Sequence, residues 1–271
     1  MARQNLDPSE DTARSMLGRY AECLASLLGD RLEAVILCGS LAMGSYVPEE
    51  SDIDQITILQ HAAPAGAEAD ARRCRQRTMD AFDGVINLAD VVYRPRDLAR
   101  PWRTEWDLQL ETKHLVTVPE ELLRIHDHGR IVCSHGFLIS ELAHPTREEM
   151  IAYDERWRRW NAAWQTTHPE FTASIQADLT PRIAAQRILS RAVWHYYFAT
   201  GETCFDKHRV ADQLRRDVPR YLFQDAVELA TRVRKRRSQD LFDGEFDALR
   251  GWFHSVREWC SAHDVGAVPV A

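Results

Sequence analysis

The amino-acid sequence predicts an α/β domain over residues 1–144 and an all-α domain over residues 145–271. Short apolar runs of the length of buried strands alternate with helical patterns only before about Pro145. Beyond it, apolar residues recur at helical spacing alone. We therefore expect a mixed β-sheet flanked by helices in the first domain and a helical bundle in the second.

A helix and two strands open the N-terminal domain. Apolar residues recur at helical spacing over residues 11–28. The continuous apolar run 34–38 is typical of a strand that is buried on both faces, and it ends at a Gly-Ser pair. After the turn at residues 48–51, residues 52–59 predict a second strand.

The remainder of this domain continues the alternation of helix and strand. A helix is predicted over residues 69–82, and the turn signal Asp83-Gly84 precedes a third strand over residues 85–93. Residues 131–133 predict an edge strand. The order of these elements favours the α/β class.

Helical segments alone follow Pro145. Thr146 begins a long amphipathic helix with Glu148 and Glu149 in its first turn, a pattern typical of a capped helix start. Further helices are predicted over residues 181–200, 206–216, 219–234 and 246–260.

Composition excludes several classes of protein. The 34 Lys and Arg against 41 Asp and Glu give a net charge of −7, which argues against binding duplex nucleic acid by phosphate neutralisation and suits a cationic small molecule. No apolar run reaches the roughly 18 residues that span a bilayer, and residues 1–8 lack the pattern of a secretion signal. The six cysteines have neither zinc-site nor disulfide-framework spacing, so we expect a cytoplasmic protein.

The first chemical feature is the Gly-Ser pair at the end of the first strand. Gly39 and Ser40 lie where a buried strand gives way to the start of a helix. Backbone N–H groups at a helix start bind phosphate, and a glycine without Cβ permits close approach. The pair therefore predicts a phosphate-binding turn.

The second feature is a pair of acids in the second strand. Asp52 and Asp54 are two residues apart, so both carboxylates project from one face, about 7 Å apart along the strand. Carboxylates hold hard divalent cations such as Mg²⁺. The spacing predicts a magnesium site.

A third acid, Asp90, lies within the apolar run of the third strand. Three carboxylates on adjacent strands would repel one another unless cations lie between them, as in a two-metal phosphoryl-type transfer. Asp90 is then a metal ligand and the general base. Two alternatives remain open: Asp90 pairs with Arg94, or Asp83 or Asn87 takes its place.

These motifs resemble a known superfamily. The pattern Gly-Ser, eleven residues, Asp-x-Asp resembles the signature of the nucleotidyltransferases, which include DNA polymerase beta and the aminoglycoside nucleotidyltransferases. The stretch Ala199-Thr-Gly-Glu-Thr-Cys-Phe-Asp-Lys207 is similar to part of the helical domain of streptomycin/spectinomycin adenylyltransferases, and Pro101-Trp-Arg103 also resembles that group.

The resemblance implies transfer of a nucleoside monophosphate, AMP from ATP, to a hydroxyl of a small polyhydroxylated cationic acceptor, typically an aminoglycoside antibiotic, with release of pyrophosphate. Two Mg²⁺ ions would be held by Asp52 and Asp54, with Asp90 holding one of them. The resemblance also implies that residues 1–144 are the catalytic domain and that residues 145–271 close over the nucleotide and substrate.

It further implies roles in nucleotide binding. Gly39 and Ser40 would receive the β- and γ-phosphates, and Lys207 would reach the triphosphate from the second domain. The sequence leaves open whether the chain is a monomer or a homodimer.

Two other interpretations stay open from the sequence. The same fold nucleotidylates a protein or RNA in toxin–antitoxin relatives, and a catalytically silent nucleotide-binding module would retain the same motifs. His126-Asp-His128 predicts a surface turn rather than a metal site, because no third ligand lies nearby in the sequence.

Overall fold

The computed structural model describes residues 7–48, 51–64, 66–102, 118–167, 179–236, 243–264 and 266–270. The chain divides into two compact units, Met1–Pro145 and Thr146–Ala271, which we call the N-terminal and C-terminal units. All six cysteines are free thiols. None of the helices in the described ranges has the length and apolar character that crossing a bilayer demands.

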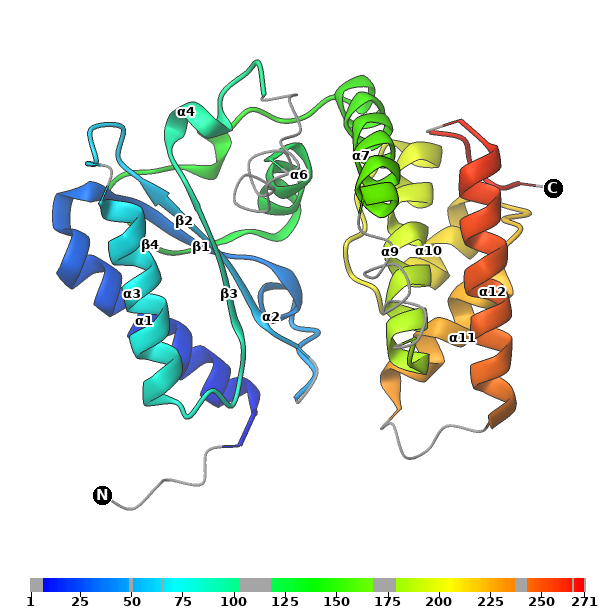
Figure 1. Cartoon of the computed structure of the whole chain (residues 1–271), viewed down its shortest axis with the longest axis horizontal. Coiled ribbons are helices and arrows are strands. Elements are labelled where there is room, and N and C mark those ends of the chain that lie inside the picture. The colour runs from blue at the N-terminus through cyan, green and yellow to red at the C-terminus, as the bar shows by residue number, and fades with distance from the viewer. Residues whose placement is uncertain are drawn as a thin grey trace. The chain divides into compact units, whose positions relative to one another are not determined.

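The N-terminal unit is built on a four-stranded mixed sheet (Figure 1). Its elements in chain order are α1 (Glu10–Leu28), η1 (Gly29–Arg31), β1 (Leu32–Leu37), α2 (Gly39–Met43), β2 (Ile53–Leu59), α3 (Ala67–Ala81), β3 (Leu88–Tyr93), α4 (Pro95–Leu98), α6 (Val118–His128), β4 (Arg130–Ser134) and η3 (Ile139–Glu141). The strand order is β3-β2-β1-β4, in which β1 pairs antiparallel with both β2 and β4, while β2 and β3 are parallel. The predicted mixed sheet flanked by helices is confirmed.

Different helices cover the two faces of this sheet. Side chains at successive positions of a strand point to opposite faces. In β2, Ile53 and Leu59 belong to a core with buried residues of α1 and α3, whereas Ile56 and Ile58 belong to a second core with residues of α4 and α6. Figure 1 shows α1 and α3 on one side of the sheet and α6 on the other. Even-numbered positions of β2 therefore face α6.

The third strand is shorter than the sequence predicts. β3 begins at Leu88 rather than at residue 85, because the chain that leaves α3 first closes a hydrogen-bonded turn. In this turn Gly84 N–H donates to the Met79 carbonyl at 2.9 Å, and Val85 N–H donates to the Phe82 carbonyl at 3.1 Å. Local turn bonds thus take the backbone groups that an extended strand would have paired.

The described part of the C-terminal unit is helical. Its helices are α7 (Arg147–Thr167), α9 (Pro181–Thr200), α10 (Val210–Asp217), α11 (Gln224–Lys235) and α12 (Asp243–Ala262). α9 packs against α10, α11 and α12, and so forms the centre of the unit. α10 begins four residues later than predicted, since the Asp206 carboxylate accepts the His208 N–H at 2.9 Å in a preceding turn.

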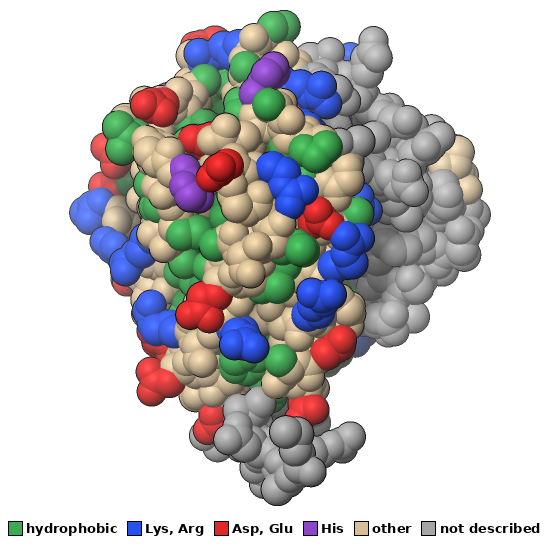
Figure 2. Space-filling view, turned by 90° about the vertical axis from the view of Figure 1, so that its left-hand side faces the viewer, with side chains coloured by type: hydrophobic (Ala, Val, Ile, Leu, Met, Phe, Trp, Pro, Cys, Tyr) green, Lys and Arg blue, Asp and Glu red, His purple; other side chains and the backbone are tan. Residues whose placement is uncertain are grey.

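Charged side chains of both signs are interspersed on the face of the molecule shown in Figure 2. Acidic and basic groups alternate over the described residues of this face, and neither gathers into a continuous block.

Candidate active site

The turn between β1 and α2 brings Gly39 against Asp54. Gly39 has φ +67°, and a Cβ placed on it would lie 2.0 Å from Asp54 Oδ2. The preceding residue is tied to the same strand, since Cys38 N–H donates to the Asp54 carbonyl at 2.9 Å. Ser40 follows in α2 and is half-buried. The glycine is therefore required twice, for its left-handed backbone and for the space that the carboxylate occupies.

Asp54 is the second residue of β2, and Asp52 directly precedes the strand. Both side chains are half-buried. By the alternation of β2, Asp54 projects from the face that α6 covers, together with Ile56 and Ile58. The structure thus places Asp54 beside the Gly39 turn, on one defined face of the sheet.

Asp90 lies on the opposite face. In the parallel pairing of β2 and β3, Asp54 is opposite Ala89, and Asp90 is one residue further along. The Asp90 carboxylate accepts hydrogen bonds from Tyr20 of α1 at 2.7 Å and from Thr57 at 2.9 Å. The prediction that Asp90 lies beside Asp52 and Asp54 is therefore wrong, because its position in the register turns it toward α1.

The alternatives to Asp90 also lie away from Asp54. Asp83 is exposed in the turn after α3, and the Asn87 side chain is exposed before β3. The suggested pairing of Asp90 with Arg94 does not form; Arg94 binds Glu68 at 3.1 Å and the carbonyl of Ala63 at 2.6 Å. Within the described residues, β3 presents no acid on the face of Asp54.

The enclosed Asp90 carboxylate gives the stability of the fold a pH dependence. Burial raises its pKa from 3.8 to about 6, against the opposing effect of the Tyr20 and Thr57 hydrogen bonds. The folded chain therefore holds a proton at pH 4–6 that the unfolded chain has lost, so the contribution of Asp90 to stability is largest at low pH and falls as pH rises through this range. The loss amounts to at most about 3 kcal/mol.

We expect Asp90→Asn, which carries no titrating group, to lack this dependence. Urea unfolding of both chains between pH 4 and pH 7 measures it. The free energy of unfolding of the native chain minus that of the variant should fall as pH rises. A difference that stays constant with pH would contradict the proposed burial of an ionisable carboxyl.

One flank of α6 adds charged groups that the sequence analysis missed. Glu121 and Arg124 are half-buried on the helix that covers the Asp54 face. Burial raises the pKa of Glu121 to about 7; the charge of Arg124 opposes this, and the charges of Glu120 and Asp54 add to it. Arg124 donates to Glu120 at 2.6 Å. A half-buried acid here was not recognisable from the sequence, because charged residues of a short helix usually face solvent.

His128, the last residue of α6, contacts the Gly39 turn. Gly39 N–H donates to His128 Nε2 at 3.1 Å, and Nδ1 lies 3.1 Å from the Asp127 carboxylate. With Nε2 as the acceptor, the ring proton lies on Nδ1, directed at Asp127. Its side chain is only 9% exposed. The prediction of a surface turn at His126–His128 is wrong for His128, which is packed against the candidate site.

Asp52 and Asp54 can bind a hard divalent cation only if a bound ligand supplies the remaining coordinating atoms. Asp52 and Asp54 offer carboxylate oxygens, the ligands that Mg²⁺ prefers together with phosphate oxygens and water. Among the described residues no three His, Cys, Asp or Glu side chains are grouped to hold a metal ion. The two aspartates therefore suit a metal whose other ligands come from a bound phosphate.

A comparison with solved structures identifies the fold. No protein-family model matches the sequence, and neither does any curated protein. A crystal structure of spectinomycin adenyltransferase AAD(9) from Enterococcus faecialis, with ATP and spectinomycin, matches 89% of this chain and 99% of its own, with a TM-score of 0.53 and 12% identity. This chain shares the fold of that adenyltransferase. The resemblance inferred from the Gly-Ser and Asp-x-Asp motifs is confirmed at the level of fold.

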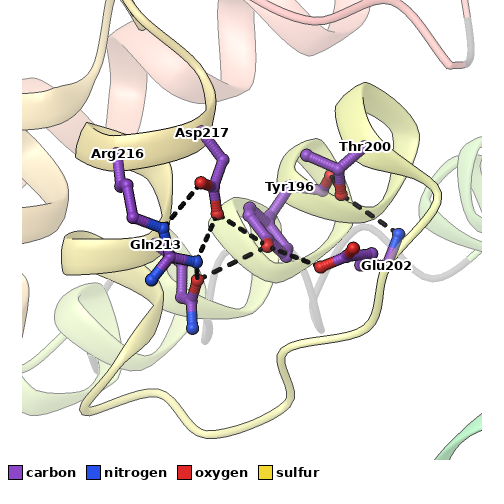
Figure 3. Close-up of polar contacts among 6 residues, drawn as sticks. All are labelled: Tyr196, Thr200, Glu202, Gln213, Arg216 and Asp217. Carbon is purple, nitrogen blue, oxygen red and sulfur yellow. Dashed lines mark hydrogen bonds and ion pairs between the residues drawn. The ribbon is translucent and has the colours of Figure 1, made fainter.

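The segment that carries Lys207 belongs to the C-terminal unit. This segment leaves α9 at Gly201, whose φ is +78°, and ends where α10 begins. Figure 3 shows Tyr196 of α9 pointing between Glu202 and Asp217. Its hydroxyl lies 3.0 Å from Asp217 and 3.3 Å from Glu202, so it ties the start of the segment to α10.

Further bonds hold the same segment. Thr200 Oγ1 accepts the Glu202 N–H at 3.1 Å and donates to the Tyr196 carbonyl at 2.8 Å. Lys207 itself is half-buried. Its role at the triphosphate stays a prediction that rests on the resemblance.

Proposed function

We propose that this protein is an enzyme that transfers a nucleoside monophosphate, AMP from ATP, to a hydroxyl of a small polyhydroxylated cationic acceptor of the aminoglycoside type, and releases pyrophosphate. One observation carries the proposal. Asp54 lies against Gly39 at the β1–α2 turn, in a fold shared with an adenyltransferase whose structure holds ATP and spectinomycin. A phosphate-binding turn and a cation-binding carboxylate are thereby adjacent.

Each residue of this site has a separate role in the proposed reaction. Gly39 and Ser40 would bind the β- and γ-phosphates through their backbone N–H groups, and Lys207 would add a positive charge to the triphosphate. Asp52 and Asp54 would hold two Mg²⁺ ions, which neutralise phosphate charge as it redistributes toward the leaving pyrophosphate. Positioning and charge neutralisation would supply most of the rate enhancement.

Nucleotide binding at the Gly39 turn involves His128. The Gly39 N–H is engaged by His128 Nε2 in this structure. A phosphate oxygen would replace the imidazole as acceptor, so we propose that His128 swings away or turns its Nδ1–H toward the phosphate when the nucleotide binds.

The experiment that tests the function is an assay of pyrophosphate release. The purified chain is incubated with Mg²⁺, each of the four nucleoside triphosphates in turn, and a panel of aminoglycosides that includes spectinomycin and streptomycin. We expect release that requires both a triphosphate and an acceptor, and mass spectrometry of the acceptor should show the added nucleoside monophosphate. Mg²⁺-dependent triphosphate binding without release for any acceptor would contradict the small-molecule function.

A second candidate is a nucleotide-binding module without catalysis. It is favoured by one observation, the presence of Ala89 rather than an acid opposite Asp54 on β3. Such a module would bind Mg²⁺ and triphosphate but release no pyrophosphate with any small-molecule, protein or RNA acceptor. Acceptor-dependent release by the native chain would exclude it.

A further inference from the structure

The reaction proposed above needs a group that removes the proton of the attacking hydroxyl. β3, the strand next to β2, has no such group on the face of the sheet from which Asp54 projects. Ala89 is opposite Asp54, and the following side chains on that face, Val91 and Tyr93, are apolar or packed in the core under α6. Asp90 is hydrogen-bonded to Tyr20 on the opposite face. The base must come from another element.

α6 is one of the elements that cover this face. Leu122 and Ile125 of α6 pack in one core with Ile56 and Cys38, the residues next to Asp54 on its face of β2 and next to Gly39. The last residue of the helix, His128, accepts the Gly39 N–H. α6 therefore lies along the same side of the sheet as the phosphate-binding turn and the Asp54 carboxylate.

Glu121 lies on the flank of α6 that faces this site. Residues 121, 124 and 128 are three and seven positions apart, so they share one side of the helix. The contact of His128 with Gly39 shows which way that side points. The electrostatic coupling agrees, because the charge of Asp54 acts on Glu121 and the charge of Glu121 acts on Cys38.

The Glu121 carboxylate also lacks a structural role of its own. Its neighbour Glu120 takes the hydrogen bond of Arg124 at 2.6 Å. Among the residues that the structure describes, no hydrogen bond or ion pair of Glu121 is formed. The charge of Arg124 acts on Glu121, but burial outweighs it. A half-buried carboxylate without a hydrogen bond is costly to the fold, and a ligand that brings a proton or a cation offsets the cost.

We propose that Glu121 of α6, rather than Asp90 of β3, is the third carboxylate of the reaction centre and the general base. This inference rests on the proposed function. The Glu121 carboxylate accepts the proton of the acceptor hydroxyl, whose oxygen forms a bond to the α-phosphorus. The bond between the α-phosphorus and the bridging oxygen breaks, and pyrophosphate leaves with that electron pair.

The test compares three variants, Glu121→Gln, Asp90→Asn and Glu120→Gln, by steady-state turnover and by the Kd of Mg²⁺-ATP. Glu121→Gln should lower kcat by about 100-fold or more, the usual contribution of a general base, with little change in nucleotide Kd. Asp90→Asn and Glu120→Gln should each lose far less kcat. A structural effect of Glu121 would instead weaken nucleotide binding and kcat together.

Two further outcomes would overturn the assignment. One is retention of kcat in Glu121→Gln, and the other is a loss in Asp90→Asn that equals or exceeds the loss in Glu121→Gln. If Glu121→Gln fails to fold, Glu121→Asp replaces it; it keeps the charge but shortens the side chain, and unaltered kcat would again reject the proposal. Absence of release by the native chain would count against the proposed function itself, and not against Glu121 alone.

Discussion

Asp54→Asn should abolish nucleotidyl transfer while leaving the chain folded. A carboxylate-bound Mg²⁺ contributes several kcal/mol of charge stabilisation in a phosphoryl-type transfer, and each ~1.4 kcal/mol is a factor of ten in rate. The amide keeps the shape of the side chain beside Gly39 but removes the negative charge. We therefore expect kcat to fall at least about 100-fold, measured by pyrophosphate release at saturating Mg²⁺ and ATP.

The matched control is Asp83→Asn. Asp83 is exposed in the turn after α3 with φ +52°, a conformation that asparagine adopts readily. This variant makes the same chemical change outside the site, so its kcat should stay close to that of the native chain. Equal losses in the two variants, or full activity in Asp54→Asn, would reject Asp54 as a metal ligand. Thermal unfolding of each variant checks that both are folded.

The sequence predicted the parts of this site that are local in the chain. The β-strand period alone places Asp52 and Asp54 on one face, and the end of the apolar run locates the Gly39 turn. Both depend on residues within about fifteen positions of one another. The fold class followed from the same patterns, because buried strands and amphipathic helices have distinct spacings.

The position of the third acid could not be predicted in this way. Whether a residue of β3 faces Asp54 depends on the register between two strands that are separated by α3, and a shift of one residue turns every side chain to the other face. The structure has Ala89 opposite Asp54, so Asp90 faces Tyr20. Local spacing contains no information on that register.

The groups of α6 were missed for a related reason. Glu121 and His128 are residue types that commonly lie on the solvent-exposed side of a helix. Here the packing of Leu122 and Ile125 against the sheet places their side of α6 toward the site. Contacts between elements that are distant in sequence decide such burial, so a single sequence does not show it.

Gly39→Ala should both destabilise the chain and inactivate it. The substitution forces an alanine to φ +67° and places its Cβ 2.0 Å from Asp54 Oδ2 and 2.9 Å from its Cγ, distances that Cβ atoms do not reach. The left-handed backbone alone costs on the order of 1–3 kcal/mol. The Asp54 carboxylate must also move, so it no longer holds a cation beside the turn.

Gly44→Ala separates these two effects. Gly44 ends α2 with φ +73°, and nothing lies within 4 Å of a Cβ placed on it. Gly44→Ala has the same backbone cost, but its added Cβ does not contact Asp54. Urea unfolding should therefore show a larger loss of stability for Gly39→Ala than for Gly44→Ala, and only Gly39→Ala should lose transfer activity.

A double-mutant cycle can measure how much of the stability loss in Gly39→Ala comes from the contact between the added Cβ and Asp54. Asp54→Ala removes the two atoms nearest to the added Cβ, so Gly39→Ala should cost less stability in that background than in the native chain. Equal costs in both backgrounds would mean that the turn does not pack on Asp54. Coupling between the two positions, together with an unaltered Gly44→Ala enzyme, would establish that Gly39 is required because the cation-binding carboxylate occupies the space of its missing side chain.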